Sequence, residues 1–159
     1  MVPEGVKQMI GKKSTPRIYE VTRLDIRKIA DASGNRDQLY WDDDYAATTR
    51  YGGMIAPPDF FGWPLKWEPE NAFPNSSELT DYIFSELPKA GYSRVINAGM
   101  ESEFYKPVRP GDTLVLVSEI IALEEKVGKT GNMLISTIET TVTNQNGDLV
   151  ARQRQSAIH

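Results

Sequence analysis

The sequence predicts an α+β domain in which short helices come first and a curved antiparallel sheet follows. Glycine and proline divide the residues up to about 93 into short pieces, some with helical periodicity. The residues after that point contain long β-rich runs separated by turn signals. Helices and strands segregated along the chain in this way are typical of α+β folds. A chain of 159 residues fits one such domain, residues 1–159, with a hydrophobic core of its own.

Two short helices are expected before residue 57. The first covers about residues 23–33, because Thr22 and Asp25 form the capping-box pattern that starts a helix. The second covers residues 43–50 and ends before a pair of glycines. The run from Asp42 to Asp44 supplies the N-cap and first turn of this helix, where carboxylates suit the helix dipole. We therefore do not expect a metal site at these aspartates.

Residues 57–93 are rich in proline and aromatic side chains. The prolines break this stretch into pieces of a few turns each, so a helix that packs against the sheet from here must be short or broken. One helical piece is expected after Pro57 and Pro58, because proline is accepted in a first turn. Another is expected over residues 77–87. The aromatic residues of the stretch are Phe60, Phe61, Trp63, Trp67, Phe73, Tyr82, Phe84 and Tyr92.

The C-terminal part of the chain contains four β-rich runs, over residues 95–105, 113–125, 133–144 and 149–158. The segments 127–131 and 144–148 contain glycine and predict two hairpin connections. Four long strands joined by short turns predict an antiparallel meander. Because long strands twist, we expect this sheet to curve strongly and to wrap around a helix from the middle of the chain.

Composition and charge exclude several classes of function. The net charge of −4 differs from the basic balance of nucleic-acid-binding and membrane-surface proteins. Neither a transmembrane run nor a secretory signal pattern is visible, so we expect a cytoplasmic protein. There is no cysteine, and the single histidine is His159, the last residue of the sequence. These counts exclude thiolate chemistry, Ser-His-Asp triads and HExxH zinc sites, so an enzyme of this composition needs other acid–base groups.

Two segments concentrate side chains that can carry chemistry. Residues 32–42 form the densest polar and aromatic cluster, and their simplest interpretation is a helix end followed by a solvated loop. Residues 104–114 are typical of a strand, a tight turn at Pro110-Gly111 and a second strand. Lys106 and Arg109 in this segment can face an anionic ligand, although exposed basic side chains are more often only solvated.

Three motifs in order give the sequence a family resemblance. They are Ser-Gly-Asn-x-Asp-x-Leu-Tyr-x-Asp at 33–42, Gly-Gly-Met-Ile-Ala-Pro-Pro-x-Phe at 52–60 and Phe-Tyr-Lys-Pro-Val-x-Pro-Gly-Asp-Thr-Leu at 104–114. From about residue 18 to residue 158 the chain resembles the MaoC-like dehydratases, and more narrowly the N-terminal half of MaoC dehydratase, also described as a FAS1-like dehydratase domain. The resemblance implies a hotdog fold, a curved antiparallel sheet wrapped around a central helix. It also implies hydration of trans-2-enoyl thioesters or dehydration of (R)-3-hydroxyacyl thioesters.

The family's catalytic dyad is altered in this sequence. Active members carry Gly-Asp-x-Asn-Pro-x-His, in which Asp and His activate the water, and the matching stretch here is residues 34–40. Asn35 stands at the aspartate position and Tyr40 at the histidine position. An amide cannot accept a proton, and a phenol with an ordinary pKa of about 10 is a poor base at neutral pH. Asp37 is the nearest carboxylate, two residues from Asn35.

The family's oxyanion site is altered as well. Active members have a His-Gly pair at the start of the central helix, where a backbone N–H binds the thioester oxygen, and Pro57-Pro58 matches that pair. Proline has no N–H, and losing one such donor typically costs about 2.7–4 kcal/mol of transition-state stabilisation. If the alignment is shifted by one residue, Ala56 or Asp59 would supply the N–H instead.

Three interpretations of function follow. In the first, the chain is a degenerate, non-catalytic subunit of an (R)-specific enoyl-CoA hydratase or 3-hydroxyacyl thioester dehydratase, and a partner subunit supplies the catalytic Asp and His. In the second, it is a self-sufficient homodimeric hydratase or thioesterase that uses Asp37 with Tyr40, or Asp42, and a pocket raises the pKa of Asp37. In the third, it binds acyl thioesters without turnover.

The resemblance also predicts ligands and partners. The substrate is an acyl thioester of CoA or of acyl carrier protein, and we expect no cofactor or metal. A second copy of the chain or a second MaoC-like hotdog subunit is expected to cover the exposed edge of the sheet. The positions that match the catalytic residues are Asn35, Asp37 and Tyr40. The predicted substrate-binding residues are Met54, Pro57, Pro58, Phe60, Phe61, Trp63, Lys106 and Arg109, the last two as contacts to the CoA phosphates.

Overall fold

The computed structural model describes residues 4–58, 60, 78–128 and 131–159. Helices and 3-10 turns in these ranges are α1 (Glu4–Lys7), α2 (Arg23–Ala32), η1 (Gln38–Tyr40), α3 (Asp43–Thr48), α4 (Glu78–Glu86) and η3 (Pro88–Ala90). The strands are β1 (Arg17–Glu20), β2 (Ile96–Phe104), β3 (Thr113–Gly128), β4 (Gly131–Thr143) and β5 (Leu149–Ile158). The four predicted β-rich runs correspond to β2–β5, whereas the short β1 and α1 were not predicted from the sequence.

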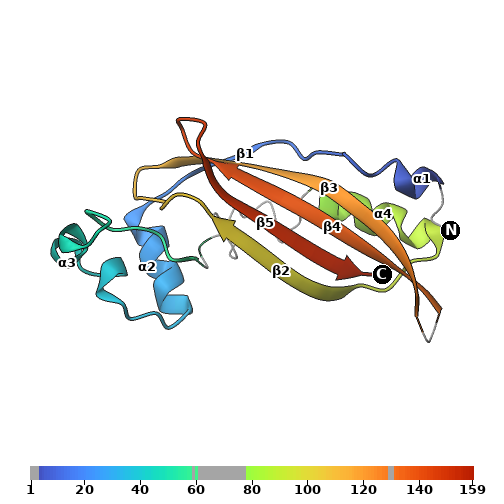
Figure 1. The fold of residues 1–159 in the computed structure, drawn as a ribbon, viewed down its shortest axis with the longest axis horizontal. Helices are drawn as coiled ribbons and strands as arrows, with labels where there is room; N and C mark the ends of the chain where they lie inside the picture. Colours follow the sequence, from blue (N-terminus) through green and yellow to red (C-terminus); the bar gives the residue numbers. More distant parts are fainter. Residues whose placement is uncertain (1–3, 59, 61–77, 129–130) are drawn as a thin grey trace.

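The strands form one curved antiparallel sheet in the order β1-β3-β4-β5-β2 (Figure 1). The predicted meander is confirmed for β3, β4 and β5. It is wrong for β2, which pairs with β5 at the far edge instead of with β3. Strand β1 occupies the second edge of β3, so β2 has no edge of β3 to pair with. The loop between β2 and β3 is tied to other segments. The N–H of Ala56 donates to the C=O of Val108 (2.8 Å), and the N–H of Gly111 donates to the C=O of Val21 (2.8 Å).

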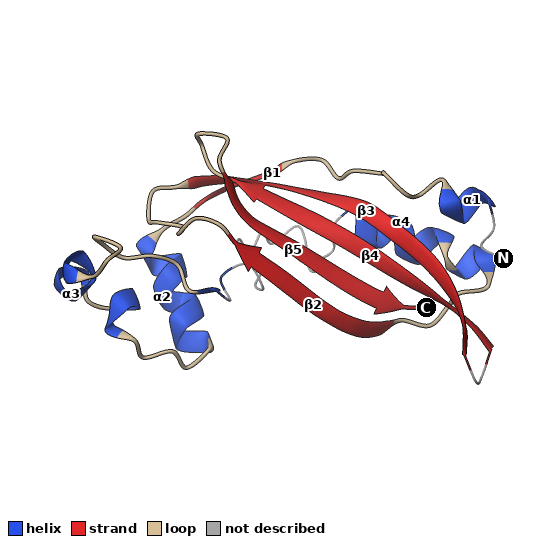
Figure 2. Cartoon of the chain, in the orientation of Figure 1, coloured by secondary structure: helices blue, strands red, loops and turns tan. Residues whose placement is uncertain are grey.

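The two helices predicted before residue 57 are present as α2 and α3, close to their predicted bounds. In α2 the side chain of Thr22 accepts from the N–H of Asp25, and the Asp25 carboxylate accepts from the N–H of Thr22, so the capping box is present. Together with α3, this helix lies at one end of the sheet (Figure 2). No helix in the described ranges is both long and apolar enough to cross a membrane.

Helix α4 lies behind β3 and β4 in Figure 1 and agrees with the helix predicted over residues 77–87. Leu79, Ile83 and Leu87 are buried, and they share one core cluster with Ile120 and Leu134 of the sheet. The spacing of four residues between these helix positions puts them on one face, so α4 buries one apolar stripe against the strands. The other helical piece, predicted after Pro57-Pro58, falls largely on residues 61–77, outside the described residues.

A second core cluster fills the opposite end of the sheet. Ile26 and Ile29 of α2 pack there with Leu114 of β3 and Val142 of β4. Met54 and Phe60, from the segment that matches the start of the family's central helix, belong to the same cluster. The loop that carries the predicted catalytic positions, residues 33–42, is therefore held against the sheet by this core.

Candidate functional site

The loop after α2 uses its polar groups to shape its own backbone. The N–H of Asn35 donates to the C=O of Ala30 (2.8 Å), and the C=O of Asn35 accepts from the indole N–H of Trp41 (2.9 Å). The side-chain oxygen of Asn35 accepts from the N–H of Asp37 (3.1 Å). An Asx turn of this kind is a common use of asparagine in loops. Asn35, at the family's aspartate position, therefore has a structural role here.

The two carboxylates of the loop are helix caps. Asp37 is exposed, and its Oδ1 accepts from the N–H of Leu39 (2.9 Å) at the start of η1. Asp42 accepts from the N–H groups of Asp44 (2.9 Å) and Tyr45 (3.0 Å) at the start of α3. The sequence analysis predicted the cap at Asp42. The second interpretation needed a pocket-buried Asp37, and in the structure of this chain that carboxylate is exposed.

Tyr40 lies on the inner side of the same loop. Its side chain is buried in the core cluster around α2, which also contains Leu39 and Ala46. The loop therefore turns Tyr40 into the core while Asp37 remains at the surface. The two positions that match the dyad, Asn35 and Tyr40, are one half-buried amide and one buried phenol, neither of which is a base at neutral pH.

In the segment that matches the oxyanion site, the N–H of Ala56 already has a hydrogen-bond acceptor. Ala56, the donor considered for a shifted alignment, gives its N–H to Val108 and cannot also bind a thioester oxygen without losing that bond. Pro57 is buried and Pro58 is exposed. Asp59, the other donor considered, and the predicted substrate-binding residues Phe61 and Trp63 lie outside the described residues.

Apart from exposed Pro58, the predicted substrate-binding residues that are described are three buried apolar side chains and two basic ones. Met54, Pro57 and Phe60 are buried, and the ring of Phe60 packs edge-on against that of Tyr19 with 6.1 Å between the centroids. Met54 and Phe60 belong to the core cluster at this end of the sheet. Sequence reasoning missed Tyr19, whose hydroxyl is buried and whose pKa is raised by burial and by the carboxylate of Asp25. Its phenol is therefore neutral at physiological pH.

The two predicted phosphate contacts already have protein partners. The ammonium of Lys106 lies 2.8 Å from Asp148, and this contact, together with a hydrogen bond from Asn144, lowers the pKa of the Asp148 carboxyl. The guanidinium of Arg109 donates to the C=O of Tyr51. Lys106 remains half-exposed, so it can exchange its exposed ion pair for a phosphate at little cost, whereas Arg109 is held more firmly.

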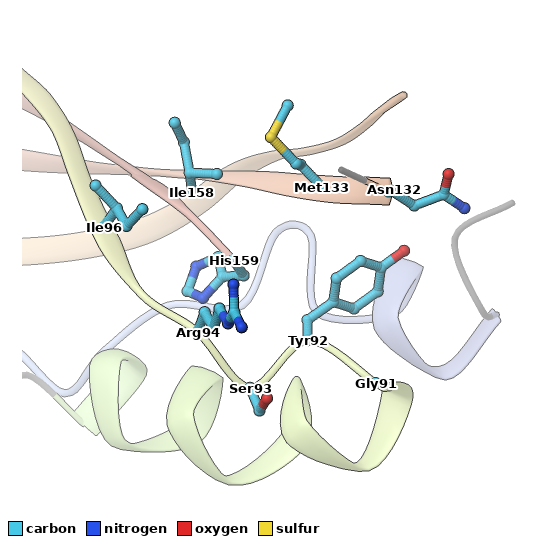
Figure 3. A pocket seen from close by; sticks show the side chains of 10 residues that line it. Gly91, Tyr92, Ser93, Arg94, Ile96, Asn132, Met133, Ile158 and His159 are labelled. Carbon is cyan, nitrogen blue, oxygen red and sulfur yellow. The ribbon is translucent and has the colours of Figure 1, made fainter. Parts of the chain in front are cut away.

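The single histidine lies at the end of the sheet that is opposite the loop of residues 33–42 (Figure 1). Its side chain is buried, and its Nε2 is 2.8 Å from the hydroxyl of Ser136. Burial lowers the pKa of His159, so the ring is neutral at pH 7. It borders a pocket of about 290 Å³ that also includes Arg94, Asn132 and Ile158 (Figure 3). The sequence contained no signal for this pocket, because its residues come from three distant segments.

Comparison with known proteins places this geometry in a family context. Residues 8–153 match the family model described as "FAS1-like, dehydratase domain region". A UPF0336 protein of Thermobifida fusca is 32% identical over 126 residues, which are 79% of this chain and 76% of that protein. A probable enoyl-CoA hydratase alpha subunit of Thermomonospora curvata is 28% identical over 137 residues, which are 81% of this chain and 41% of that protein.

Solved structures confirm the predicted hotdog fold. The ChsH1–ChsH2 complex from Mycobacterium tuberculosis contains a chain with a TM-score of 0.82 at 21% identity, and the match covers 98% of this chain and 88% of that one. A chain of the HadBC (3R-hydroxyacyl-ACP dehydratase) complex from the same organism has a TM-score of 0.68 at 20% identity, with 95% and 97% covered. The R-hydratase PhaJ1 from Pseudomonas aeruginosa has a TM-score of 0.60 at 24% identity, with 93% and 79% covered.

Proposed function

The chain belongs to the family of FAS1-like dehydratase domains, and from this premise we propose that it is the non-catalytic subunit of a two-subunit hydro-lyase. The enzyme would hydrate trans-2-enoyl thioesters, or dehydrate (R)-3-hydroxyacyl thioesters, carried by CoA or acyl carrier protein. A second hotdog subunit would supply the Asp and His that activate the water. This chain would contribute one wall of the acyl site and the shape of the entrance.

One observation carries the proposal: the polar groups at the family's catalytic positions are engaged in holding the loop. Asn35 forms an Asx turn, and Asp37 caps η1. A general base must reach the proton that it abstracts and must have a suitable pKa. Asn35 cannot accept a proton, Tyr40 is a buried phenol, and the neutral imidazole of His159 is at the other end of the sheet. These features of the described residues support a base supplied by another chain.

The relatives support a two-chain arrangement. One is named an alpha subunit of an enoyl-CoA hydratase, and two of the structures similar in fold are complexes of paired subunits. The sheet of this chain also has a long edge at β2 without a neighbouring strand among the described residues. An open edge of this length is usually covered by another chain or by a structural device that blocks pairing. We place the partner subunit there.

The test is to express this chain alone, the proposed partner subunit alone and the two together. Hydration of crotonyl-CoA and of a bulkier enoyl-CoA is then measured for each preparation. The partner is chosen as the product of an adjacent gene that keeps the Asp and His of the family motif. We expect little turnover from this chain alone and full turnover from the complex. A partner variant with its catalytic Asp replaced by Asn should abolish the activity of the complex.

The remaining outcomes identify the other two interpretations. Full activity from this chain alone would overturn the proposal in favour of a homodimeric hydratase or thioesterase that uses Asp37 and Tyr40. Tight binding of an acyl-CoA without turnover, with or without a partner, would indicate a binding module. The acyl substrate that gives the highest kcat/KM in the complex then defines the acyl class that Met54 and Phe60 accommodate.

A further inference from the structure

Strand β2, at the outer edge of the sheet, carries two acidic side chains, Glu101 and Glu103, and three exposed apolar ones, Ile96, Met100 and Phe104. Glu101 and Glu103 are two residues apart, so they point to the same face of the sheet. Ile96, Met100 and Phe104 are all at least 48% exposed. The burial pattern of this strand is exposed at every position except Glu103, which is half-buried.

The acidic face continues inward as a charged row. In the sheet register Glu101 faces Arg154 of β5, and Arg154 faces Glu139 of β4. Arg154 is 2.8 Å from Glu139 but 3.9 Å from both Glu101 and Glu103. The closest partner of Arg154 is therefore on the inner strand. Glu101 is left at the rim with a weaker contact, and its side chain is 71% exposed. Glu103 accepts a hydrogen bond from the hydroxyl of Tyr105 and faces Arg152 of β5 in the register.

A second copy of this chain would meet that rim with its own glutamates. Two identical edges that pair antiparallel are related by a two-fold axis perpendicular to the sheet, so side chains on one face meet side chains on the same face. The regular part of β2 runs from Gly99 to Phe104, because the register shifts between Asn97 and Gly99. Pairing centred on Ser102 places each Glu101 opposite the Glu103 of the other copy. Pairing centred one residue earlier places Glu101 opposite its own copy.

Both of the registers that use the longest part of the regular strand therefore oppose carboxylates directly, at the distance where like charges destabilise a sheet. The registers centred on Met100 or Glu103 pair a shorter part of the strand. The register centred on Glu103 also places Glu103 opposite the Glu103 of the other copy. The exposed apolar side chains favour the binding of another chain at this edge, whereas the two glutamates disfavour pairing with the β2 edge of a second copy.

We infer that the β2 edge is charged to reject a second copy of this chain and to accept a hotdog subunit whose edge strand carries basic side chains opposite Glu101 and Glu103. The inference rests on the proposed function, because it names the kind of partner that the two-subunit enzyme needs. Basic side chains there would pair with rim carboxylates that Arg154 only partly neutralises. Apolar contacts at Ile96, Met100 and Phe104 would add affinity without distinguishing partners.

The inference is tested with variants of this chain alone. In E101Q/E103Q the like-charge contacts are removed, while Arg154 keeps its bond to Glu139. The matched control is E20Q/E124Q, which makes the same charge change at exposed positions on β1 and β3. Self-association is measured by sedimentation equilibrium and native mass spectrometry. We expect roughly tenfold tighter self-association of E101Q/E103Q than of the wild type, and no change in the control.

A second arm supplies the missing basic edge. The E101K/E103K variant, labelled by mass, is mixed with the wild-type chain, and we expect a mixed dimer that dissociates at high salt while each chain alone self-associates weakly. Hydrogen exchange should then protect the amides of residues 96–104. Wild-type self-association through these residues that is as tight as that of E101Q/E103Q would overturn the inference, as would the absence of a mixed dimer. Neither result depends on turnover, so the proposed function is judged separately by the hydration assay.

Discussion

The substitution D37N separates a structural role of Asp37 from a catalytic one. The Oδ1 of Asp37 accepts a 2.9 Å hydrogen bond from the N–H of Leu39 at the start of η1. Asparagine has the same acceptor oxygen and is about as good an N-cap as aspartate. It cannot act as a base. If Asp37 only caps the turn, D37N should change neither the stability of the chain nor the activity of the two-subunit enzyme.

The matched variant D37A removes the cap itself. Loss of an N-cap typically costs about 1 kcal/mol, which corresponds to a decrease in Tm of about 2–4 °C for a domain of this size. We therefore expect a small decrease in Tm for D37A, no decrease for D37N, and kcat within about twofold of the wild type for both in the complex. D42N tests the other carboxylate of the self-sufficient interpretation, and it should also leave Tm and kcat unchanged because Asp42 caps α3 in the same manner.

Thermal unfolding of the chain and hydration of crotonyl-CoA by the complex measure the two effects independently. General acid–base catalysis contributes about 10²–10⁴-fold to a rate. A loss of that size in D37N with an unchanged Tm would refute the structural assignment of Asp37. It would place the base in this chain and favour the self-sufficient enzyme.

Three further predictions concern the core, the buried histidine and the entrance. L134A should destabilise the chain by about 2–5 kcal/mol in urea unfolding, because Leu134 is fully buried, and I121A at an exposed position should have a much smaller effect. The pKa of His159 is lower in the folded chain than in the unfolded chain, so the unfolded chain binds the proton first as the pH falls below about 6.5. The free energy of unfolding should therefore decrease by up to about 1.4 kcal/mol per pH unit until the pH reaches the folded pKa. This component should disappear in H159Q, and a pH profile identical to that of the wild type would contradict the assignment. K106M should raise the KM of the complex for a CoA thioester about tenfold at unchanged kcat. An unchanged KM would show that Lys106 does not contact the CoA phosphates.

Local interactions explain why much of the fold could be predicted. The capping box of Thr22 and Asp25, the cap at Asp42 and the hairpin at residues 144–148 depend on neighbours within a few residues, and all three are present. The resemblance in three ordered motifs also led to the correct family and fold. Proton-transfer chemistry has strict requirements for residue type, so the predicted match of Asn35 to a catalytic Asp and of Tyr40 to a His could be interpreted before the fold was known.

Long-range pairing decided the remainder. No local pattern indicates that β2 joins β5 and not β3, because the choice depends on which strand edges remain open, and β1 occupies the second edge of β3. The same holds for Ala56, whose N–H is occupied only because Val108 lies opposite it in space. The sequence by itself determined that the loop of residues 33–42 contains Asn35 and Tyr40 but no histidine. Only the tertiary structure decided that His159 is buried far from the loop and that the strand of Glu101 and Glu103 forms an open edge of the sheet. Each of these depends on contacts between residues that are distant in the chain.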